Sequence, residues 1–527
     1  MHVEDQSEVI AFLTEPTSYA GLGLTGAVKR IETHISVVFL IGDRAFKLKR
    51  AVLFPYLDFS DLGRRRAAAK TELTLNRRTA PALYLGLIPV RQTDAGLQLG
   101  EIGAPPSDTV EWLVAMRRFR QRDLLDRMAA EGRLDARLME QVAEQIAGFH
   151  ASAEIRRDGG GLAGFQLAAT TVREALAECP PGIFDPGAVA SFISDTDAQI
   201  ERLAPLLEER RKDGLCRHCH GDLHLRNICL VDGQPTLFDC IEFSEDFAVI
   251  DVLYDLAFLL MDLWHRGLGD HANTTFNRYL HTAQLDHGTD ALAGLAALPL
   301  FLSSRAAIRA HVTATMAGAD GKGGVSKALT NEARTYLDLA IRLLSPPAPR
   351  LIAIGGMPGT GKTTLGRALT PQVLPVPGAI LLRSDVIRKE LAGVDPLTRL
   401  GPEGYSKAMT RRTYQALLAR AGAVLAAGHS VIVDAVSARA KDRDAIEAVA
   451  RDHGAGFNGI WLDAPVDTLE ERIARRREDA SDATVELVRE TAEYETGAIA
   501  WHRIDASQGP ERVAESALAA TQLIDEP

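Results

Sequence analysis

A glycine-rich loop that follows a short apolar stretch constrains the fold of this chain more than any other feature. Residues 351–355 are apolar enough for a buried strand, and the run from Gly356 to Thr363 spells G-x-x-x-x-G-K-T. Glycines let backbone amides turn inward around phosphate oxygens, and the N-terminus of a helix beginning near Thr364 adds positive potential. This succession of strand, loop and helix predicts a phosphate-binding loop at the carboxyl edge of a parallel sheet.

The chemistry of this loop assigns a role to its polar residues. Lys362 is placed to reach the β- and γ-phosphates, and the hydroxyl of Thr363 is placed to ligate Mg²⁺. A glycine-rich turn without a ligand is the alternative, and the flanking strand and helix argue against it. We therefore predict a Walker A site for ATP and Mg²⁺, formed by Gly356, Met357, Pro358, Gly359, Thr360, Gly361, Lys362, Thr363 and Thr364.

A proline-rich segment divides the chain. The 527 residues are too many for one hydrophobic core, and Pro346 and Pro347 cannot continue a helix because proline lacks an amide donor. We predict an N-terminal domain over 1–345 and a C-terminal domain over 350–527. Strand-like stretches alternate with helical patterns in the second domain, which predicts an α/β fold with a parallel sheet. Its expected strands are 351–355, 379–383, 430–434 and 459–463.

Three aspartate and arginine positions in the C-terminal domain favour a small-molecule kinase over an ATPase motor or a GTPase. Asp385 and Arg388 follow the second expected strand, where ligands gather in such sheets. Asp385 is a candidate base for an acceptor hydroxyl, and Arg388 a candidate contact for an anionic acceptor or the γ-phosphate. Asp434 ends an apolar strand and suits an outer-sphere contact to Mg²⁺. Helix capping is the alternative for both aspartates.

Two further arginines are candidates for transition-state stabilisation. Arg472 and Arg476 fall on one face of an expected helix, and a closing lid would bring them to the phosphates. A solvated basic helix explains either arginine equally well. Together, these features resemble a group of P-loop kinases that includes the zeta toxins, gluconate kinase and adenylylsulfate kinase. The resemblance implies an α/β P-loop NTPase fold and gives the role of base to Asp385 in its Asp-x-x-Arg segment.

The N-terminal domain carries a second set of phosphotransfer residues. Asp222 and Asn227 lie five residues apart in His-Gly-Asp-Leu-His-Leu-Arg-Asn, and Asp239 follows after an expected hairpin. In protein-kinase chemistry, Asp222 would deprotonate the acceptor hydroxyl, while Asn227 and Asp239 would ligate Mg²⁺. Upstream, Lys47 is expected to reach the α- and β-phosphates with Glu72 as its partner. A surface carboxylate is the alternative for Glu72.

These residues resemble the aminoglycoside and choline kinase group over roughly residues 30–310. The resemblance implies a two-lobed, protein-kinase-like α+β domain, which agrees with a sequence pattern of strands first and helices after. One departure is clear, because Thr33 to Ser36 occupy the region where a G-x-G-x-x-G loop would lie. An acidic rim for a cationic aminoglycoside would consist of Glu242, Glu245 and Asp246, although clustered acids are also ordinary solvated surface.

Composition limits the partners and the compartment. The formal net charge of −11 argues against a general nucleic-acid binder. The apolar stretch Val249 to Trp264 contains three aspartates and is shorter than the roughly 20 residues of a membrane span, so we expect a buried helix. The first residues lack the pattern of a secretory signal, which favours the cytoplasm. Cys216-x-x-Cys219-His220 resembles a haem-attachment pattern, but that reaction needs an exported chain, and a zinc site lacks four evident ligands.

The leading hypothesis is therefore an ATP-dependent phosphotransferase with two nucleotide sites, each acting on a small-molecule hydroxyl. The whole architecture resembles bacterial proteins described as bifunctional aminoglycoside phosphotransferase and ATP-binding proteins. One alternative is a P-loop ATPase or kinase regulated by a catalytically weak kinase-like N-terminal domain. Another is a zeta-toxin-like kinase or a nucleic-acid end kinase. The acceptors, the nucleotide preference and a homo-oligomeric state stay open.

Overall fold

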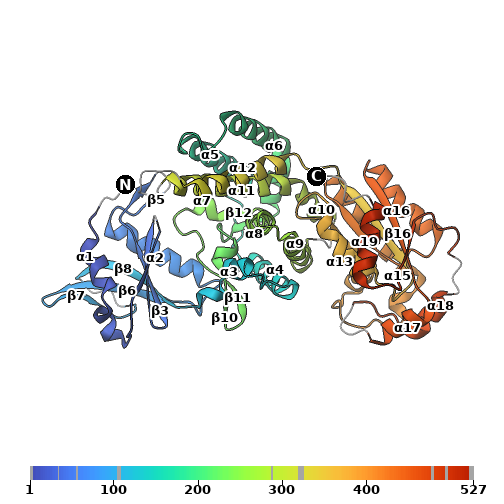
Figure 1. The fold of residues 1–527 in the computed structure, drawn as a ribbon, viewed down its shortest axis with the longest axis horizontal. Helices are drawn as coiled ribbons and strands as arrows, with labels where there is room; N and C mark the ends of the chain where they lie inside the picture. Colours follow the sequence, from blue (N-terminus) through green and yellow to red (C-terminus); the bar gives the residue numbers. More distant parts are fainter. Residues whose placement is uncertain are drawn as a thin grey trace. The chain divides into compact units, whose positions relative to one another are not determined.

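The computed structural model describes residues 4–33, 35–54, 57–103, 108–285, 289–318, 326–475, 480–492 and 496–521. These residues fall into two compact units (Figure 1). The first unit combines Met1–Thr170 with Glu208–Leu259, and the second combines Thr171–Leu207 with Leu260–Pro527. The contacts thus group residues 260–345 with the C-terminal part, whereas the predicted domain limits at 345 and 350 follow the proline-rich segment and stay a prediction.

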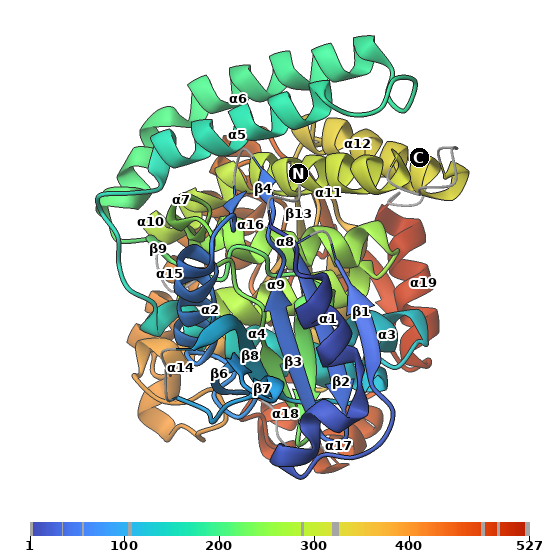
Figure 2. The ribbon, with the colours of Figure 1, turned by 90° about the vertical axis from the view of Figure 1, so that its left-hand side faces the viewer.

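An antiparallel sheet forms the small lobe of the first unit, with strand order β1-β2-β3-β8-β6-β7. Successive side chains point to opposite faces of a strand. Val37 and Phe46 therefore pack with Leu13 of α1 on one face, while Leu40 and Ala45 pack with Ala69 of α2 on the other (Figure 2). These elements are α1 (Ser7–Thr14), β1 (Lys29–Glu32), β2 (Ser36–Ile41), β3 (Arg44–Lys49), α2 (Leu62–Asn76), β6 (Tyr84–Thr93), β7 (Gly96–Leu99) and β8 (Thr109–Arg117).

Helices and short hairpins form the rest of the first unit. Its α4 (Ala136–Ser152) is preceded by the N-cap residue Asp135, whose side chain accepts a hydrogen bond from the Leu138 amide. The expected pair of strands before Asp239 is present as β10 and β11, which pair antiparallel. The remaining elements are β4 (Leu53–Phe54), β5 (Leu57–Asp58), α3 (Leu125–Ala130), β9 (Cys216–His218), β10 (Ile228–Val231), β11 (Gln234–Leu237), α7 (Glu245–Ala248), β12 (Val249–Asp251) and α8 (Val252–His265).

Paired helices make up the N-terminal part of the second unit. Ser303 of α11 donates a hydrogen bond to the carbonyl of Ala340 in α12, at 2.7 Å. The helical segment Thr289–Gly318 is, among the described residues, long and apolar enough to cross a membrane, but 72% of its most apolar window is buried, as in a core helix. The helices are α9 (Gly269–Thr282), α10 (Thr289–Leu292), α11 (Leu298–Gly318) and α12 (Lys327–Leu344), together with α5 (Gly161–Ala177) and α6 (Pro186–Lys212), each of which has residues in both units.

A parallel sheet forms the C-terminal part, with strand order β14-β15-β13-β16-β17. The predicted strands are confirmed as β13 (Arg350–Gly356), β14 (Ile380–Arg383), β15 (Val431–Asp434) and β16 (Gly456–Asp463), while β17 (His502–Asp505) was not expected. Ile352 and Ile432 lie at the centre of its core. The helices are α13 (Lys362–Leu369), α14 (Ser384–Leu391), α15 (Lys407–Ala426), α16 (Ala440–Asp452), α17 (Val466–Arg475), α18 (Val485–Ala492) and α19 (Pro510–Thr521).

The outer strand β14 is bordered by a helix of the same unit instead of another strand. Asn277 of α9 accepts a hydrogen bond from the Leu381 amide at 2.9 Å, and its side-chain amide donates to the Ala379 carbonyl at 3.1 Å. Asn273 donates to the same carbonyl at 3.0 Å. These side chains satisfy backbone groups that an edge strand would otherwise leave open to solvent or to another chain.

Candidate active sites

The predicted catalytic loop of the first unit runs from His220 to Asn227, after β9. The side-chain amide of Asn227 donates to the Asp222 carbonyl at 2.9 Å and to its carboxylate at 2.8 Å. Asp222 keeps 38% of its side chain exposed, and His224 Nε2 lies 3.4 Å from it. The loop thus presents one accessible carboxylate whose orientation is fixed by its own asparagine.

Asp255 of α8 holds this loop in place, although sequence reasoning did not assign it a role. Its carboxylate is fully buried and accepts hydrogen bonds from the amides of His220 at 3.0 Å and Gly221 at 2.8 Å. His150 Nε2 lies 3.0 Å from the same carboxylate. The sequence did contain a clue, because an aspartate inside an apolar helix must find polar partners.

His150, Asp255 and Cys219 also bring their ligand atoms within 4.8 Å of one another, as a metal site would. The contacts of Asp255 with the loop amides give this cluster a structural explanation instead. The thiol of Cys219 donates to the Ile250 carbonyl at 3.4 Å, and burial raises the pKa of that thiol well above its ordinary value. The five cysteines, all within the described residues, are free thiols.

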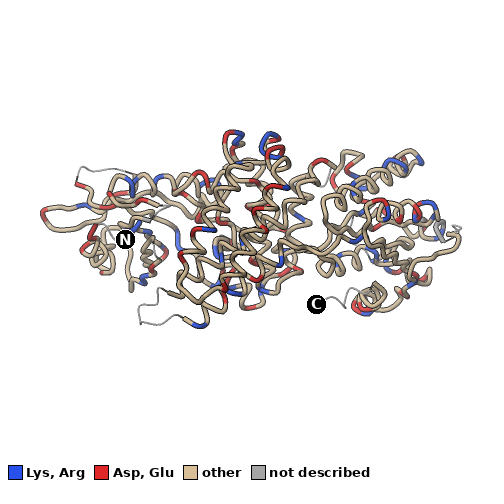
Figure 3. The backbone as a smooth tube through the Cα atoms, turned by 90° about the horizontal axis from the view of Figure 1, so that it is seen from above, with Lys and Arg blue, Asp and Glu red and all other residues tan. Residues whose placement is uncertain are grey.

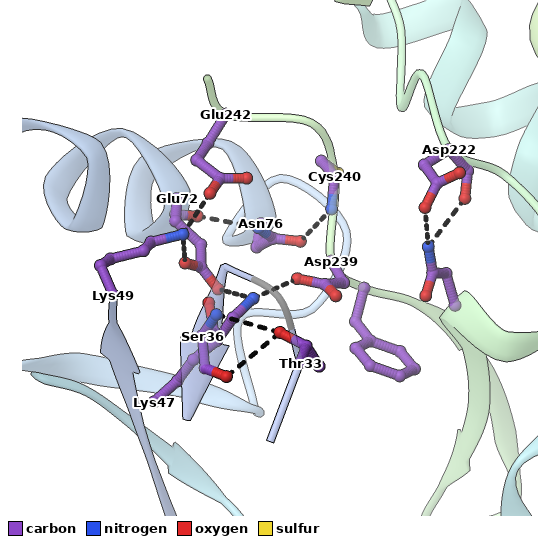
Figure 4. Close-up of polar contacts among 12 residues, drawn as sticks. Thr33, Ser36, Lys47, Lys49, Glu72, Asn76, Asp222, Asp239, Cys240 and Glu242 are labelled. Carbon is purple, nitrogen blue, oxygen red and sulfur yellow. Dashed lines mark hydrogen bonds and ion pairs between the residues drawn. The ribbon is translucent and has the colours of Figure 1, made fainter. Parts of the chain in front are cut away.

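Asp239, the second predicted metal ligand, follows β11 in a left-handed conformation with φ of 63°. Lys47 Nζ lies 2.6 Å from its carboxylate and 2.9 Å from Glu72 Oε1 (Figure 4). Burial acts to lower the pKa of Lys47, but the carboxylates of Asp239 and Glu72 outweigh it and raise that pKa well above its ordinary value. The structure therefore pairs Lys47 with Glu72, as the sequence predicted, and also with Asp239, for which the sequence had predicted a contact to Mg²⁺ instead.

A second lysine extends this charged cluster. Lys49 and Glu72 have no exposed side-chain area, and Lys49 Nζ lies 2.6 Å from Glu72 Oε2. Lys49 also contacts Glu242, which is only 5% exposed, so Glu242 does not belong to the expected acidic rim. Burial acts to raise the pKa of Glu72, but the two lysines lower it to about 2. Burial raises the pKa of Glu242 above its ordinary value.

The turn between β1 and β2 takes the place of a glycine-rich loop. The Thr33 amide donates to the Ser36 carbonyl at 2.9 Å, and the Ser36 amide donates to the Thr33 hydroxyl at 3.0 Å. These two amides are therefore used within the turn in this structure. The departure from the kinase pattern noted in the sequence is a short hairpin connection.

The phosphate-binding loop of the second unit has the predicted context of strand β13 and helix α13. Gly356, Gly359 and Gly361 adopt φ values of 140°, 86° and 92°, which other residues rarely accept. A Cβ on Gly356 would lie 2.6 Å from the Leu462 carbonyl oxygen. Lys362 Nζ contacts the carbonyl oxygens of Gly356 at 2.9 Å and Met357 at 3.0 Å. The ammonium thus contacts the backbone of the loop itself.

Thr363 and Asp434 meet beneath this loop. The Thr363 hydroxyl donates to Asp434 Oδ2 at 2.6 Å, and Arg383 Nε lies 3.7 Å from the same oxygen. Burial raises the pKa of Asp434, while Lys362 and Arg383 act in the opposite direction. A hydroxyl and a carboxylate form an oxygen donor set of the kind that Mg²⁺ prefers. The two predicted metal residues are therefore adjacent.

The predicted acceptor residues lie on α14. Asp385 is in its first turn. Arg388 is 7% exposed, and its guanidinium donates to the Gly404 carbonyl at 3.0 Å and stacks 4.9 Å from the Tyr405 ring. In this structure Arg388 therefore organises the segment before α15. Arg472 lies on α17, while Arg476 lies outside the described residues.

Asp482, which sequence reasoning left without a role, joins segments around this site. Its carboxylate accepts hydrogen bonds from the buried Lys389 at 3.0 Å, the Leu400 amide at 2.9 Å and the Tyr405 hydroxyl at 2.8 Å. Burial acts to raise the pKa of Asp482, but these donors lower it below its ordinary value. The contacts attach the segment from Leu400 to Tyr405 to α14.

Two family models match the chain at these sites. One described as the phosphotransferase enzyme family matches residues 94–295, and one described as an AAA domain matches residues 351–495. The chain thus joins a phosphotransferase domain of the aminoglycoside type to a P-loop kinase domain. It is an ATP-dependent kinase, with ATP and Mg²⁺ as its cofactors.

Relatives that match along most of the chain include the uncharacterized protein Rv2004c of Mycobacterium tuberculosis (strain ATCC 25618 / H37Rv). It is 32% identical over 499 residues, covering 91% of this chain and 93% of the relative. The uncharacterized protein Mb2027c of Mycobacterium bovis matches to the same extent. The chain belongs to the family of these proteins. A shikimate kinase of Zymomonas mobilis is 32% identical over 135 residues, covering 25% of this chain and 67% of that kinase.

Solved structures resemble parts of the chain. A choline/ethanolamine kinase family protein from Mesorhizobium loti is 13% identical and covers 64% of this chain and 98% of its own, with a TM-score of 0.39. A gluconokinase from Sinorhizobium meliloti 1021 is 22% identical and covers 33% of this chain and 92% of its own, with a TM-score of 0.24. Likenesses of this size say nothing about substrates.

Proposed function

We propose that each of the two domains transfers the γ-phosphoryl group of Mg-ATP to a hydroxyl of a small molecule. The observation that supports this proposal is the presence of two separate sets of side chains that suit phosphates and Mg²⁺. In the first set, Lys47 pairs with Asp239, and Asn227 is bonded to Asp222; in the second, Thr363 is bonded to Asp434, on which the charge of Lys362 acts. Both groups combine a lysine with oxygen ligands, which suits a triphosphate and a hard divalent ion.

In the N-terminal site, Asp222 is the candidate base. Its exposed carboxylate can accept the proton of an acceptor hydroxyl, and Asn227 holds one of its oxygens at 2.8 Å. Lys47 neutralises phosphate oxygens, and Glu72 orients it. Mg²⁺, held by Asn227 and Asp239, would stabilise the charge of the transferring phosphoryl group.

In the C-terminal site, Asp385 is the candidate base, at the carboxyl end of β14. Lys362 and the loop amides would bind the phosphates, and Thr363 and Asp434 would hold Mg²⁺. The similarity to a shikimate kinase supports a small hydroxylated acceptor. Arg388 and Arg472 stay candidates for contacts to an anionic acceptor or to the phosphates. Arg476 is a candidate on sequence alone.

A general nucleic-acid partner is disfavoured by charge. Basic and acidic residues are interspersed along the chain (Figure 3), and the net charge is −11. An electrostatic footprint for a phosphate backbone would need clustered lysine and arginine. Small-molecule acceptors are therefore part of the proposal.

Radiolabelled ATP and a library of hydroxylated metabolites test the proposal with the full chain. We expect Asp222→Ala to abolish one set of phosphorylated products and Lys362→Ala to abolish another. If the wild-type protein transferred phosphate to no acceptor, the proposal would fail. If Asp222→Ala left every product intact while Lys362→Ala removed all of them, the N-terminal domain would be a regulatory module without chemistry.

A further inference from the structure

Strand β3 carries two lysines on one face, because residues two apart in a strand point the same way. Lys47 is the expected phosphate ligand, and Lys49 is completely buried. A buried ammonium is costly unless it is paired. Lys49 pairs with Glu72 at 2.6 Å and with Glu242 (Figure 4). Its ammonium also lies 5.4 Å from the centre of the Phe59 ring. The second lysine is therefore part of an internal ion network.

Glu242 connects this network to the predicted metal ligand. It lies three residues after Asp239, on the segment that leaves β11. The Cys240 amide of that segment donates to Asn76 of α2 at 2.9 Å, and Phe243 packs against Phe59 and its apolar neighbours. The Lys49–Glu242 pair thus adds a charged attachment between the small lobe and the segment that holds Asp239.

The balance of charges explains why such a pair matters for nucleotide binding. Lys47 and Lys49 supply two positive charges, and Glu72, Asp239 and Glu242 supply three negative charges, which leaves one negative charge in excess. When Lys47 turns toward phosphates, Lys49 is the cation that stays with Glu72 and Glu242. Without Lys49, both carboxylates would compete with the triphosphate for Lys47.

We propose that Lys49 and Glu242 form a positioning pair for the nucleotide site of the N-terminal domain, an inference that rests on the function proposed above. The pair holds the Asp239 segment against β3 and keeps Glu72 compensated while Lys47 binds phosphate. The pair helps to hold the nucleotide site in place, as a glycine-rich loop does in kinases that have one. The Thr33 and Ser36 amides do not take that role in this structure, since they bond within their own turn.

Calorimetry of Mg-ATP binding tests this proposal with the full chain. All variants carry Lys362→Ala, so that the remaining binding reports on the N-terminal site. We expect Lys49→Met to weaken Mg-ATP binding on the order of 10-fold and Glu242→Gln to weaken it by a smaller factor. The double variant should bind no worse than Lys49→Met, because the two residues act as a unit. Lys70→Met, at an exposed position of α2, is the matched control and should change nothing.

A second measurement separates positioning from general damage. Binding of ATP is compared with and without Mg²⁺, and we expect the gain from Mg²⁺ to shrink in Lys49→Met because Asp239 is displaced. A variant that merely loosened the fold would lose both affinities together. The double variant also guards against misfolding, since replacing both members of a buried ion pair is often tolerated when losing one is not.

The outcomes distinguish the positioning role of Lys49 and Glu242 from the function proposed for the N-terminal domain. If the Lys362→Ala parent bound no Mg-ATP, the N-terminal nucleotide site itself would be refuted. If the parent bound it and Lys49→Met bound it equally well, with the same gain from Mg²⁺, the positioning role would be refuted alone. Additive losses in the double variant would likewise show that the two residues do not act as a pair.

Discussion

Asp255→Asn should release the predicted catalytic loop of the N-terminal domain, residues 220–227. The buried carboxylate accepts from the amides of His220 and Gly221, and it contacts His150 at 3.0 Å. Asparagine has the same shape but only one acceptor oxygen. Its NH₂ group would face either the Gly221 amide or the His220 amide, so one buried backbone N–H would lose its partner.

The magnitude follows from these contacts. An unsatisfied buried donor costs about 1–3 kcal/mol, and a hydrogen bond to a charged group contributes about 1.5–3 kcal/mol. The variant loses one of these hydrogen bonds, and the other is no longer made to a charged group. Together these losses should destabilise the closed conformation of the loop by about 3 kcal/mol. Since about 1.4 kcal/mol corresponds to a factor of ten, the loop should open on the order of 100-fold more often.

Hydrogen exchange followed by mass spectrometry measures this opening directly, in peptides that contain residues 220–227. Asp262→Asn is the matched control, because Asp262 lies on the same helix and pairs with Arg266 at 2.8 Å instead of the loop. We expect rapid exchange of the loop amides in Asp255→Asn only. Unchanged protection in that variant, or equal loss in the control, would refute the assignment of Asp255 as the anchor.

Two further predictions concern the edge of the C-terminal sheet and the acid stability of the N-terminal domain. Asn277→Ala removes the acceptor of the Leu381 amide, so hydrogen exchange in β14 should rise on the order of 10-fold. Thr274→Ala, at a half-buried position of α9 whose hydroxyl donates to the Asp270 carbonyl, should leave that exchange unchanged, and equal exchange in both variants would contradict this. Because the pKa of Glu72 is lowered to about 2, its ionisation contributes stability that is fully present above about pH 4.5 and is lost as the pH falls toward 2. Glu72→Gln should therefore remove on the order of 3 kcal/mol from the acid dependence of unfolding, and an unaltered acid limb in denaturant titrations would argue against the buried pairing.

The phosphate-binding loop could be predicted from sequence because its determinants are local. The apolar strand, the glycines and Lys362 lie within a dozen residues, and the structure places Thr363 against Asp434 as the strand pattern suggested. Lys47 and Glu72 also pair as expected, in the order of strand and helix that the kinase resemblance implied. Sites whose residues lie close together in sequence, or follow a known order of strands and helices, can thus be predicted from sequence.

Long-range pairing could not be predicted in the same way. Asp255 and His150 are 105 residues apart, and Lys49 and Glu242 are 193 residues apart. The periodicity of a segment does not identify its long-range partner, so the sequence suggested that Glu242 lies in a solvent-exposed acidic rim. The aspartates that interrupt the apolar stretch before Trp264 were the available clue, because each must be paired when buried. Asp251 does pair with Arg210, at 2.6 Å.

The contacts of α9 with β14 have a practical consequence for dividing this protein. A fragment starting at Arg350 would follow the prolines and contain the whole P-loop sheet, yet it would lack Asn273 and Asn277. The edge strand β14 of its sheet would then lack these hydrogen-bond partners, and unpaired edge strands promote association between copies. A C-terminal fragment that begins before Gly269 would contain α9 and keep these hydrogen bonds. Such a fragment should therefore begin among the helices before the prolines and not at the prolines themselves.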